Sequence, residues 1–393
     1  MAMGQEQAQK PELITWLQEN IAAEGGMAFA DFMEACLYHP DYGYYTGARK
    51  RIGRAGDFFT STSVHALFGK LVGRQVEQFW QLLGGGDFTL VEQGAGEGHL
   101  SLDILDALQQ QAPELYNRLQ YVLIEISPDH RARQRERLKQ HADNGRVIWS
   151  TLDELQPFVG CFLSNELVDA FPVHLVELTS EGVREVYVVN SGEGFAEELR
   201  PPSDPRLEDY LAGLPLQLPA GYRTEINLMA RSWMVEVAQK LERGYVLTID
   251  YGYPAAERYA PWRNTGTLMC YWQHTTEENP LLRPGCQDIT AHVDFTELEQ
   301  VGERQGLSSL YFGEQYRFLM GLGFLEELMA LQAREPDAQR AQELRLTLKR
   351  LVMPESGMGD TFKVLVQGKG VPGDELLCAR RIADIPLPQG DFF

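Results

Sequence analysis

The stretch Leu90-Val91-Glu92-Gln93-Gly94-Ala95-Gly96-Glu97-Gly98-His99-Leu100 decides the fold of this chain. The apolar run 88–91 is typical of a buried parallel strand. After the glycines, leucine and isoleucine recur at helical spacing over residues 100–108. Strand, glycine turn and helix in this order predict the first βα unit of a Rossmann-like sheet, the usual seat of a nucleotide-type ligand.

The spacing of the glycines distinguishes two classes of ligand. A dinucleotide fingerprint requires G-x-G-x-x-G, whereas here the third glycine, Gly98, comes one residue early. Glu92 and Glu97 flank the turn, so we expect them to repel a pyrophosphate and to attract the cationic S-adenosylmethionine (SAM). The turn resembles motif I of the class I SAM-dependent methyltransferases. The predicted cofactor contacts in it are Glu92, Gly94, Ala95, Gly96 and Gly98.

A second acid follows at the end of the next apolar strand. Residues 121–126 close on Glu125, and Ser127-Pro128 then opens a helix. One carboxylate there can accept hydrogen bonds from both ribose hydroxyls, although Glu125 could instead only cap the helix. A third strand at 146–149 places residues 150–153 beside the adenine. We therefore predict Ile126 and Leu152 as further cofactor contacts.

Composition limits the class of protein. The 393 residues are 44% hydrophobic, without an apolar run long enough for a membrane span. Neither a signal peptide nor a transit peptide is recognisable, and five cysteines without a C-x-x-C pair indicate reduced thiols without zinc. We therefore expect a cytoplasmic protein with no metal. The net charge of −21 repels phosphate backbones and so argues against nucleic acid as a partner. It suits a cationic partner, or serves solubility alone.

Along the chain we predict four regions. Residues 1–62 form N-terminal helices and a lid loop over the active site, and 63–312 form the Rossmann-like core with insertions. Residues 313–353 are a helical insertion, and 354–393 hold the last core strand and a tail. Within the core, 191–222 is rich in Pro, Gly and Glu, which predicts an exposed connection with one short helix. His130 and His141 are predicted to be solvated at the surface.

Another polar group stands at the end of the apolar strand that begins near Gly160. Asn165 and Glu166 close this strand, and Asp169 follows three residues later. Because ligands bind beyond the carboxyl ends of strands in open α/β sheets, these side chains are predicted to face the substrate. The alternative is that they cap the next turn. His292, between two aspartates at 288 and 294, could be a general base or a hydrogen-bonded loop residue.

Several stretches together resemble the MidA-type family, whose mitochondrial members are assembly-factor methyltransferases for respiratory complex I. The resemblance extends from about residue 11 to 366 in one order throughout. The stretches that carry it are Tyr44-Tyr45, Gly56-Asp57-Phe58-Phe59-Thr60-Ser61, Glu92-Gln93-Gly94-Ala95-Gly96-Glu97-Gly98, Ser164-Asn165-Glu166-Leu167-Val168-Asp169-Ala170-Phe171-Pro172-Val173, Ile249-Asp250-Tyr251-Gly252 and Asp288-Ile289-Thr290-Ala291-His292-Val293-Asp294-Phe295.

The resemblance implies a fold and an activity. It implies an α/β class I methyltransferase core, with a mostly parallel sheet, helices on both faces, and added helical and β elements. It also implies SAM as methyl donor and an arginine of a protein partner, such as a respiratory-complex subunit, as acceptor. Thr60 and Asn165 would then contact the cofactor. Glu97 stands where the family often has a basic residue.

Charge suggests how such a transfer would work. Paired carboxylates can hold a guanidinium bidentately and orient its lone pair. We expect Glu166 and Asp169, with Asn165 and with Asp57 from the lid, to hold the acceptor. Three alternatives remain open: a SAM-binding assembly chaperone without turnover, a small-molecule methyltransferase and an NAD(P)-dependent oxidoreductase. The sequence does not define the acceptor, the number of methyl groups added or the oligomeric state.

Overall fold

The computed structural model describes residues 10–47, 65–192, 194–273, 275–353, 361–371 and 376–381. Asp57 and Thr60, two of the predicted site residues, lie outside these ranges. The chain divides into two compact units. Unit 1 comprises Met1–Phe58, Val168–Met234 and Gly252–Leu298, and unit 2 comprises Phe59–Leu167, Val235–Tyr251 and Glu299–Phe393. Each unit thus combines separate segments of the chain. The four consecutive regions expected from the sequence stay a prediction.

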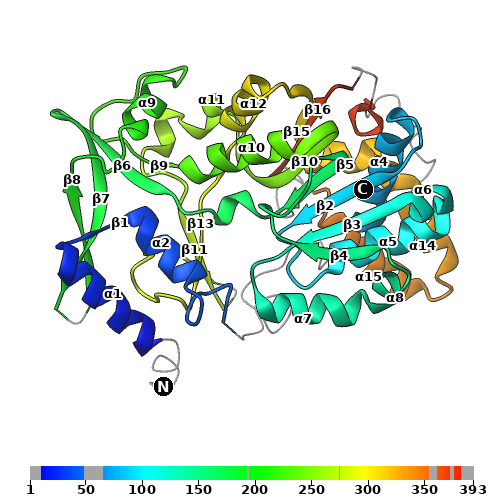
Figure 1. Ribbon diagram of the computed structural model, residues 1–393, viewed down its shortest axis with the longest axis horizontal. Coiled ribbons are helices and arrows are strands. Elements are labelled where there is room, and N and C mark those ends of the chain that lie inside the picture. Colours follow the sequence, from blue (N-terminus) through cyan, green and yellow to red (C-terminus); the bar gives the residue numbers. More distant parts are fainter. Residues whose placement is uncertain are drawn as a thin grey trace. The chain divides into compact units, whose positions relative to one another are not determined.

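Unit 2 is built on a sheet with the strand order β15-β16-β10-β5-β2-β3-β4 (Figure 1). The strands from β10 to β4 are parallel, and β16 and β15 are antiparallel to their neighbours. The bounds are β2 Phe88–Gln93, β3 Leu119–Ile124, β4 Val147–Ser150, β5 Phe158–Asn165, β10 Leu241–Tyr253, β15 Ser308–Glu314 and β16 Phe362–Lys369. The end of β10 belongs to unit 1, where it pairs with β14, Val293–Asp294.

These strands are continuous apolar runs because both faces of the sheet are buried. Leu90 and Cys161 lie in register and belong to the main core. The next pair in register, Val91 and Phe162, points to the opposite face and is buried as well. The α/β class predicted from the sequence is confirmed.

Helices pack on this sheet. Phe79 of α4 stacks on Tyr245 of β10 with ring centroids 3.9 Å apart. Gly69 lets α4 approach α5 closely, because a Cβ at this position would lie 2.4 Å from Cβ of Asp103. The helices of unit 2 are α4 Leu67–Leu82, α5 His99–Gln111, α6 Pro113–Arg118, α7 Pro128–Arg137, α8 Lys139–Asp143, α13 Gln315–Gly321, α14 Phe324–Arg334, α15 Ala338–Lys349 and the 3₁₀ turn η3 Leu377–Ala379. Helices α10 Leu228–Lys240 and α12 Phe295–Arg304 run from unit 1 into unit 2.

Unit 1 contains an antiparallel sheet of order β1-β7-β6-β9, with β8 paired to β7, and a smaller sheet of order β12-β11-β13. Its strands are β1 Met27–Ala28, β6 His174–Thr179, β7 Gly182–Ser191, β8 Gly194–Arg200, β9 Arg223–Ile226, β11 Met269–Trp272, β12 Thr275–Glu277 and β13 Asp288–Thr290. Its remaining helices are α1 Pro11–Glu24, α2 Phe29–Tyr38, η1 Val168–Ala170, α9 Arg206–Ala212, α11 Ala255–Arg258 and η2 Pro261–Arg263. Leu17, Phe29 and Val186 are among the side chains that form its core.

Two expectations about local structure were wrong. Strand β8 occupies part of the segment 191–222, where the sequence indicated only a connection with a helix. None of its residues is fully buried, so its sequence lacks the alternation of polar and apolar residues that reveals a strand. His130 and His141 are buried rather than solvated. His141 hydrogen-bonds the Tyr116 hydroxyl at 2.7 Å and Asp106 at 3.0 Å. Because these partners lie 25 and 35 positions away, the local sequence does not predict them.

No helix in the described part of the chain is long and apolar enough to span a bilayer.

Candidate active site

The glycine turn follows the last residue of β2. Gly94, Gly96 and Gly98 have φ of 75°, 53° and 79°, the left-handed region that a glycine adopts without strain. At Gly94 a side chain would also meet Leu167, since a Cβ would lie 2.9 Å from its Cδ1 atom. Ala95 is half-buried and packs against the core. The chain therefore turns sharply into α5 through three residues that carry no side chain.

Glu92 anchors the base of this turn. Its carboxylate is 2% exposed, and Oε2 accepts hydrogen bonds from the hydroxyls of Ser101 and Tyr121, each at 2.6 Å. Burial raises the pKa of Glu92, and the two hydroxyl donors oppose this rise. The predicted cofactor residue thus also ties β2 to α5 and to β3.

Glu97 is not an unpaired negative charge beside the glycine turn, contrary to the expectation from the sequence. Arg133 Nη1 donates to its Oε1 at 2.7 Å, and Arg137 Nη2 lies 3.5 Å from its Oε2. Arg137 also donates to the Glu97 carbonyl. Two arginines of α7 therefore compensate this charge, so repulsion of a pyrophosphate by Glu97 no longer supports the choice of ligand.

Glu125 directly follows β3, which ends one residue earlier. Its Oε1 accepts the Ser127 N–H at 2.8 Å, and its Oε2 lies 3.6 Å from His130 Nδ1. One carboxylate oxygen of Glu125 therefore caps the start of α7, which was the alternative to ribose binding. Ile126 beside it is 58% exposed. Leu152 is half-buried in the turn after β4.

The end of β5 carries the third polar group. Asn165 Nδ2 donates to Glu166 Oε1 at 3.1 Å, and the Glu166 N–H bonds the Ile249 carbonyl at 3.0 Å. Glu166 has φ of 53°, a left-handed conformation that costs a non-glycine residue about 1 kcal/mol or more. Buried Asp250 accepts the N–H groups of Leu167 at 3.2 Å and Tyr251 at 2.8 Å. These bonds hold Glu166 in its strained conformation.

The sheet brings most of the predicted site together. Strands β4, β3, β2 and β5 are parallel neighbours, so the residues after each strand share one edge. The predicted residues at this edge are Glu92, Gly94, Ala95, Gly96, Gly98, Glu125, Ile126, Leu152, Asn165 and Glu166. Asp169 instead belongs to unit 1, where it is buried in η1 and its carbonyl accepts the Ala291 N–H at 2.9 Å.

Of the predicted lid loop, the structure describes the aromatic residues 42–45 and the chain as far as residue 47. Asp57 lies outside the described residues. Tyr45 donates its hydroxyl to Asp288 Oδ1 at 2.7 Å and stacks on Tyr38 with ring centroids 5.5 Å apart. Burial raises the pKa of Tyr45 well above its usual value, and Asp288 adds to this rise. Asp288 is thus tied into the structure of unit 1.

Comparison with known proteins identifies the chain. Residues 71–313 match the family of S-adenosyl-L-methionine-dependent methyltransferases. The protein belongs to this family. A COG1565 superfamily member from Burkholderia thailandensis, bound to S-adenosyl-homocysteine, is 33% identical with a TM-score of 0.85, covering 94% of this chain and 95% of that chain.

Mitochondrial relatives are more distant in sequence. The protein arginine methyltransferase NDUFAF7 homolog of Drosophila melanogaster is 27% identical over 384 residues, which cover 90% of this chain and 84% of the relative. The protein arginine methyltransferase NDUFAF7 of Homo sapiens is 26% identical over 393 residues, covering 91% and 84%. The predicted MidA-type resemblance, the dependence on SAM and the enzyme class are confirmed.

The edge of the sheet fits the cofactor of this methyltransferase family. Oδ1 of Asn165 is buried and accepts no hydrogen bond from the described residues. Because a buried carbonyl oxygen normally has a donor, this atom suits a ligand that carries N–H or O–H groups, as SAM does. Glu125 suits a ribose diol, and exposed Ile126 suits the face of a base. Among the described residues no cluster of three or more His, Cys, Asp or Glu side chains could hold a metal ion.

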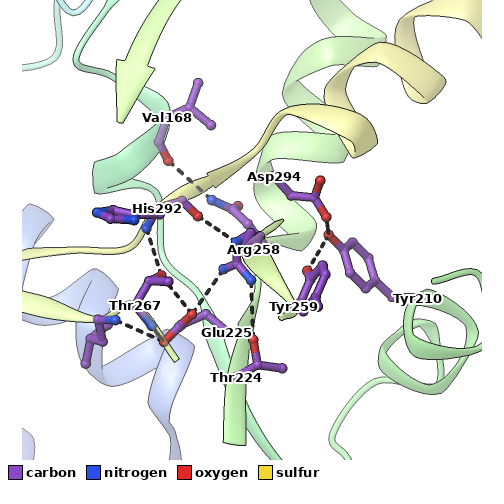
Figure 2. A network of polar contacts seen from close by, with 11 residues as sticks. Val168, Tyr210, Thr224, Glu225, Arg258, Tyr259, Thr267, His292 and Asp294 are labelled. Atoms are coloured by element: carbon purple, nitrogen blue, oxygen red, sulfur yellow. Dashed lines mark hydrogen bonds and ion pairs between the residues drawn. The ribbon is translucent and has the colours of Figure 1, made fainter. Parts of the chain in front are cut away.

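A buried ion pair organises unit 1 near His292 (Figure 2). Arg258 and Glu225 are 3% and 1% exposed, and their charged groups lie 3.0 Å apart. Arg258 Nε donates to the His292 carbonyl at 2.9 Å, and the His292 N–H bonds Thr267 Oγ1 at 3.0 Å. Asp294 accepts the Tyr210 hydroxyl at 2.7 Å. His292 is therefore held by its backbone, as a hydrogen-bonded loop residue.

The side chain of His292 makes stability depend on pH. Burial, with Arg258 and Arg263 adding to it, lowers the pKa of His292 to about 4. The unfolded chain takes up this proton near pH 6.5 and the folded protein only near pH 4, so stability should fall as pH drops between these values. We expect His292 to contribute roughly 1–3 kcal/mol to this fall. In urea denaturation, His292→Gln should lose less stability than wild type between pH 7 and pH 4.5.

Asp103 acts in the opposite direction, because burial and Asp106 raise its pKa to about 6. Asp103 is present in wild type and in His292→Gln, so its contribution to the pH dependence cancels when the two are compared. Parallel pH profiles for wild type and His292→Gln would contradict the prediction.

Sequence reasoning missed two residues that hold the architecture around the site. Gln134 bonds the Gly96 carbonyl from 38 positions away, and Arg258 reaches Glu225 across 33 positions. Gln134 lies in a helix of mostly charged residues, where a glutamine is not conspicuous. Arg258 directly follows Glu257, so its neighbours in the sequence do not indicate that it is buried.

Proposed function

We propose that this methyltransferase transfers the methyl group of SAM to the guanidinium of an arginine in a protein partner. The reaction would take place at the edge of the sheet formed by the ends of β2, β3, β4 and β5. The observation that carries the proposal is the meeting of three features at this edge: a glycine turn, an acid after β3, and the strained Glu166 after β5.

The strand order supports a class I, Rossmann-like methyltransferase fold. In β4-β3-β2-β5-β10 the order of parallel strands reverses between β2 and β5. Ligands in such sheets bind where the order reverses, beyond the carboxyl ends of the strands. The glycine turn follows one of these two strands, and Asn165 and Glu166 stand at the end of the other. The antiparallel β16 between β10 and β15 departs from a wholly parallel dinucleotide-binding sheet.

Each residue at the edge would have a definite role. Glu125 would accept the ribose hydroxyls, and the glycine turn would lie against the rest of the cofactor. Oδ1 of Asn165 would accept a hydrogen bond from the cofactor, while Nδ2 donates to the Glu166 carboxylate and orients it. When bound, SAM supplies a methyl group on a sulfonium. The protein then has to align the acceptor with this group, which is a matter of position and orientation.

Glu166 is our candidate for holding the acceptor. An arginine is cationic and a poor nucleophile, and a carboxylate can bind its guanidinium through two parallel hydrogen bonds. The expectation from the sequence that Asp169 and Asp57 also hold the acceptor stays a prediction. The strain at Glu166 supports a functional reason for its conformation, because strained residues concentrate at active sites.

The acceptor proposal draws on the relatives named protein arginine methyltransferase. The net charge of −21 is compatible with a partner that presents a basic segment. A respiratory-complex subunit is the partner that the family resemblance suggests. The cytoplasmic location expected from the sequence stays a prediction, and the relatives compared above carry mitochondrial names.

The acceptor can be tested with SAM labelled in its methyl group. We expect the purified protein, incubated with extract of its source organism, to label a protein, and acid hydrolysis to release the label as methylarginine. Equal amounts of S-adenosyl-homocysteine should form. Label in lysine or in a small molecule would contradict the arginine proposal. SAM binding without S-adenosyl-homocysteine would favour the assembly chaperone.

A further inference from the structure

Helix α7 holds the glycine turn through side chains one turn apart. Arg133 and Arg137 bind the carboxylate and carbonyl of Glu97, as described above. Gln134, between them on the helix, donates from Nε2 to the Gly96 carbonyl at 2.7 Å. The same helix receives Glu125 at its N-terminus through the Ser127 N–H. One helix therefore touches both the acid after β3 and the glycine turn after β2.

Gln134 is bonded at both ends of its amide. While Nε2 donates to Gly96, Oε1 accepts the indole N–H of Trp149 in β4 at 2.9 Å. The side chain is fully buried, and its Cγ lies 3.1 Å from where a Cβ would stand at Gly98. Because the amide has one donor end and one acceptor end committed, it cannot flip without losing both bonds.

We propose that Gln134 is a positioning residue for cofactor binding, acting through the Gly96 carbonyl, with Trp149 fixing the direction of its amide. This inference rests on the proposed function, in which the glycine turn contacts SAM. The turn has three residues with positive φ and so has many accessible conformations when nothing holds it. Gln134 selects one of them before the cofactor binds, and this preorganisation lowers the cost of binding.

The test measures SAM affinity by calorimetry in matched variants. Gln134→Met keeps the length of the side chain and removes both bonds, so we expect SAM to bind about tenfold more weakly. Gln75→Met is the control, because Gln75 is equally buried and bonds Gln78 and the Cys378 N–H, away from the turn. Gln75→Met should lower the melting temperature and leave SAM affinity within about twofold.

A second pair of variants separates positioning from general stability. Trp149→Phe removes the indole donor to Gln134, keeps an aromatic ring beside Arg135, and should weaken SAM binding about threefold. In the Gln134→Met background, the same change should have no further effect, because Trp149 acts through the glutamine. A residue that supports only overall stability would give additive effects or none on affinity.

Each result decides the proposal. A weaker SAM affinity for Gln134→Met, unchanged affinity for Gln75→Met and non-additivity with Trp149→Phe support it. If Gln134→Met binds SAM like wild type while Glu125→Ala loses binding, the positioning role is overturned and the proposed site stands. If neither Gln134→Met nor Glu125→Ala changes SAM affinity, SAM binds elsewhere, and both the proposed site and this inference fail.

Discussion

Glu166→Gln should lower methyl transfer at saturating SAM by about a thousandfold, with the SAM dissociation constant within about twofold of wild type. The substitution keeps shape and one acceptor oxygen for Asn165 Nδ2, so the end of β5 should not rearrange. It removes the negative charge that would bind and orient a guanidinium bidentately. Transfer is measured with labelled SAM and the identified acceptor, and affinity by calorimetry.

A second substitution at the same position separates chemistry from folding. Glu166→Gly removes the carboxylate and also relieves the strain at φ of 53°. It should therefore abolish transfer while leaving folding stability unchanged or raising it by up to about 1 kcal/mol. Glu114→Gln, on the exposed surface of α6, is the control and should behave like wild type. If Glu166→Gln lost SAM affinity as much as activity, Glu166 would be a cofactor ligand instead.

Arg258→Ala should destabilise the protein by about 3–5 kcal/mol, the largest effect on stability that we expect. The substitution leaves Glu225 with a buried charge and no cationic partner among the described residues. It also removes the donors to the His292 carbonyl and to Thr224 Oγ1. Urea denaturation followed by circular dichroism measures the change.

The companion variant tests the cause. In Arg258→Met with Glu225→Gln, neither position of the pair carries a charge, and the glutamine Oε1 can still accept the N–H groups of Thr267 and Leu268. This double variant should recover part of the lost stability. Lys139→Ala, which breaks the exposed Lys139–Asp143 pair, should cost under about 0.5 kcal/mol. A loss of similar size for Lys139→Ala and Arg258→Ala would contradict the role of burial.

Much of the fold could be predicted because its signals are local. The apolar run of β2, the glycines and the helical spacing of α5 lie within one short segment, and each indicates its own conformation. The same holds for Glu125, which stands between a strand and a helix cap. β8 was missed because none of its residues is fully buried, so its sequence shows no alternation of buried and exposed positions. The burial of His130 and His141 depends on partners from distant segments.

The sequence by itself determined the parallel sheet, the glycine turn and the acids after its strands, because strand, turn and helix propensities depend on neighbouring residues. Tertiary structure alone decided how charges and buried amides are paired. It neutralised Glu97 with two arginines of α7, paired Arg258 with Glu225, and locked Gln134 between Gly96 and Trp149. Such pairs join residues far apart in the chain, and only the order in which strands and helices pack brings them within bonding distance.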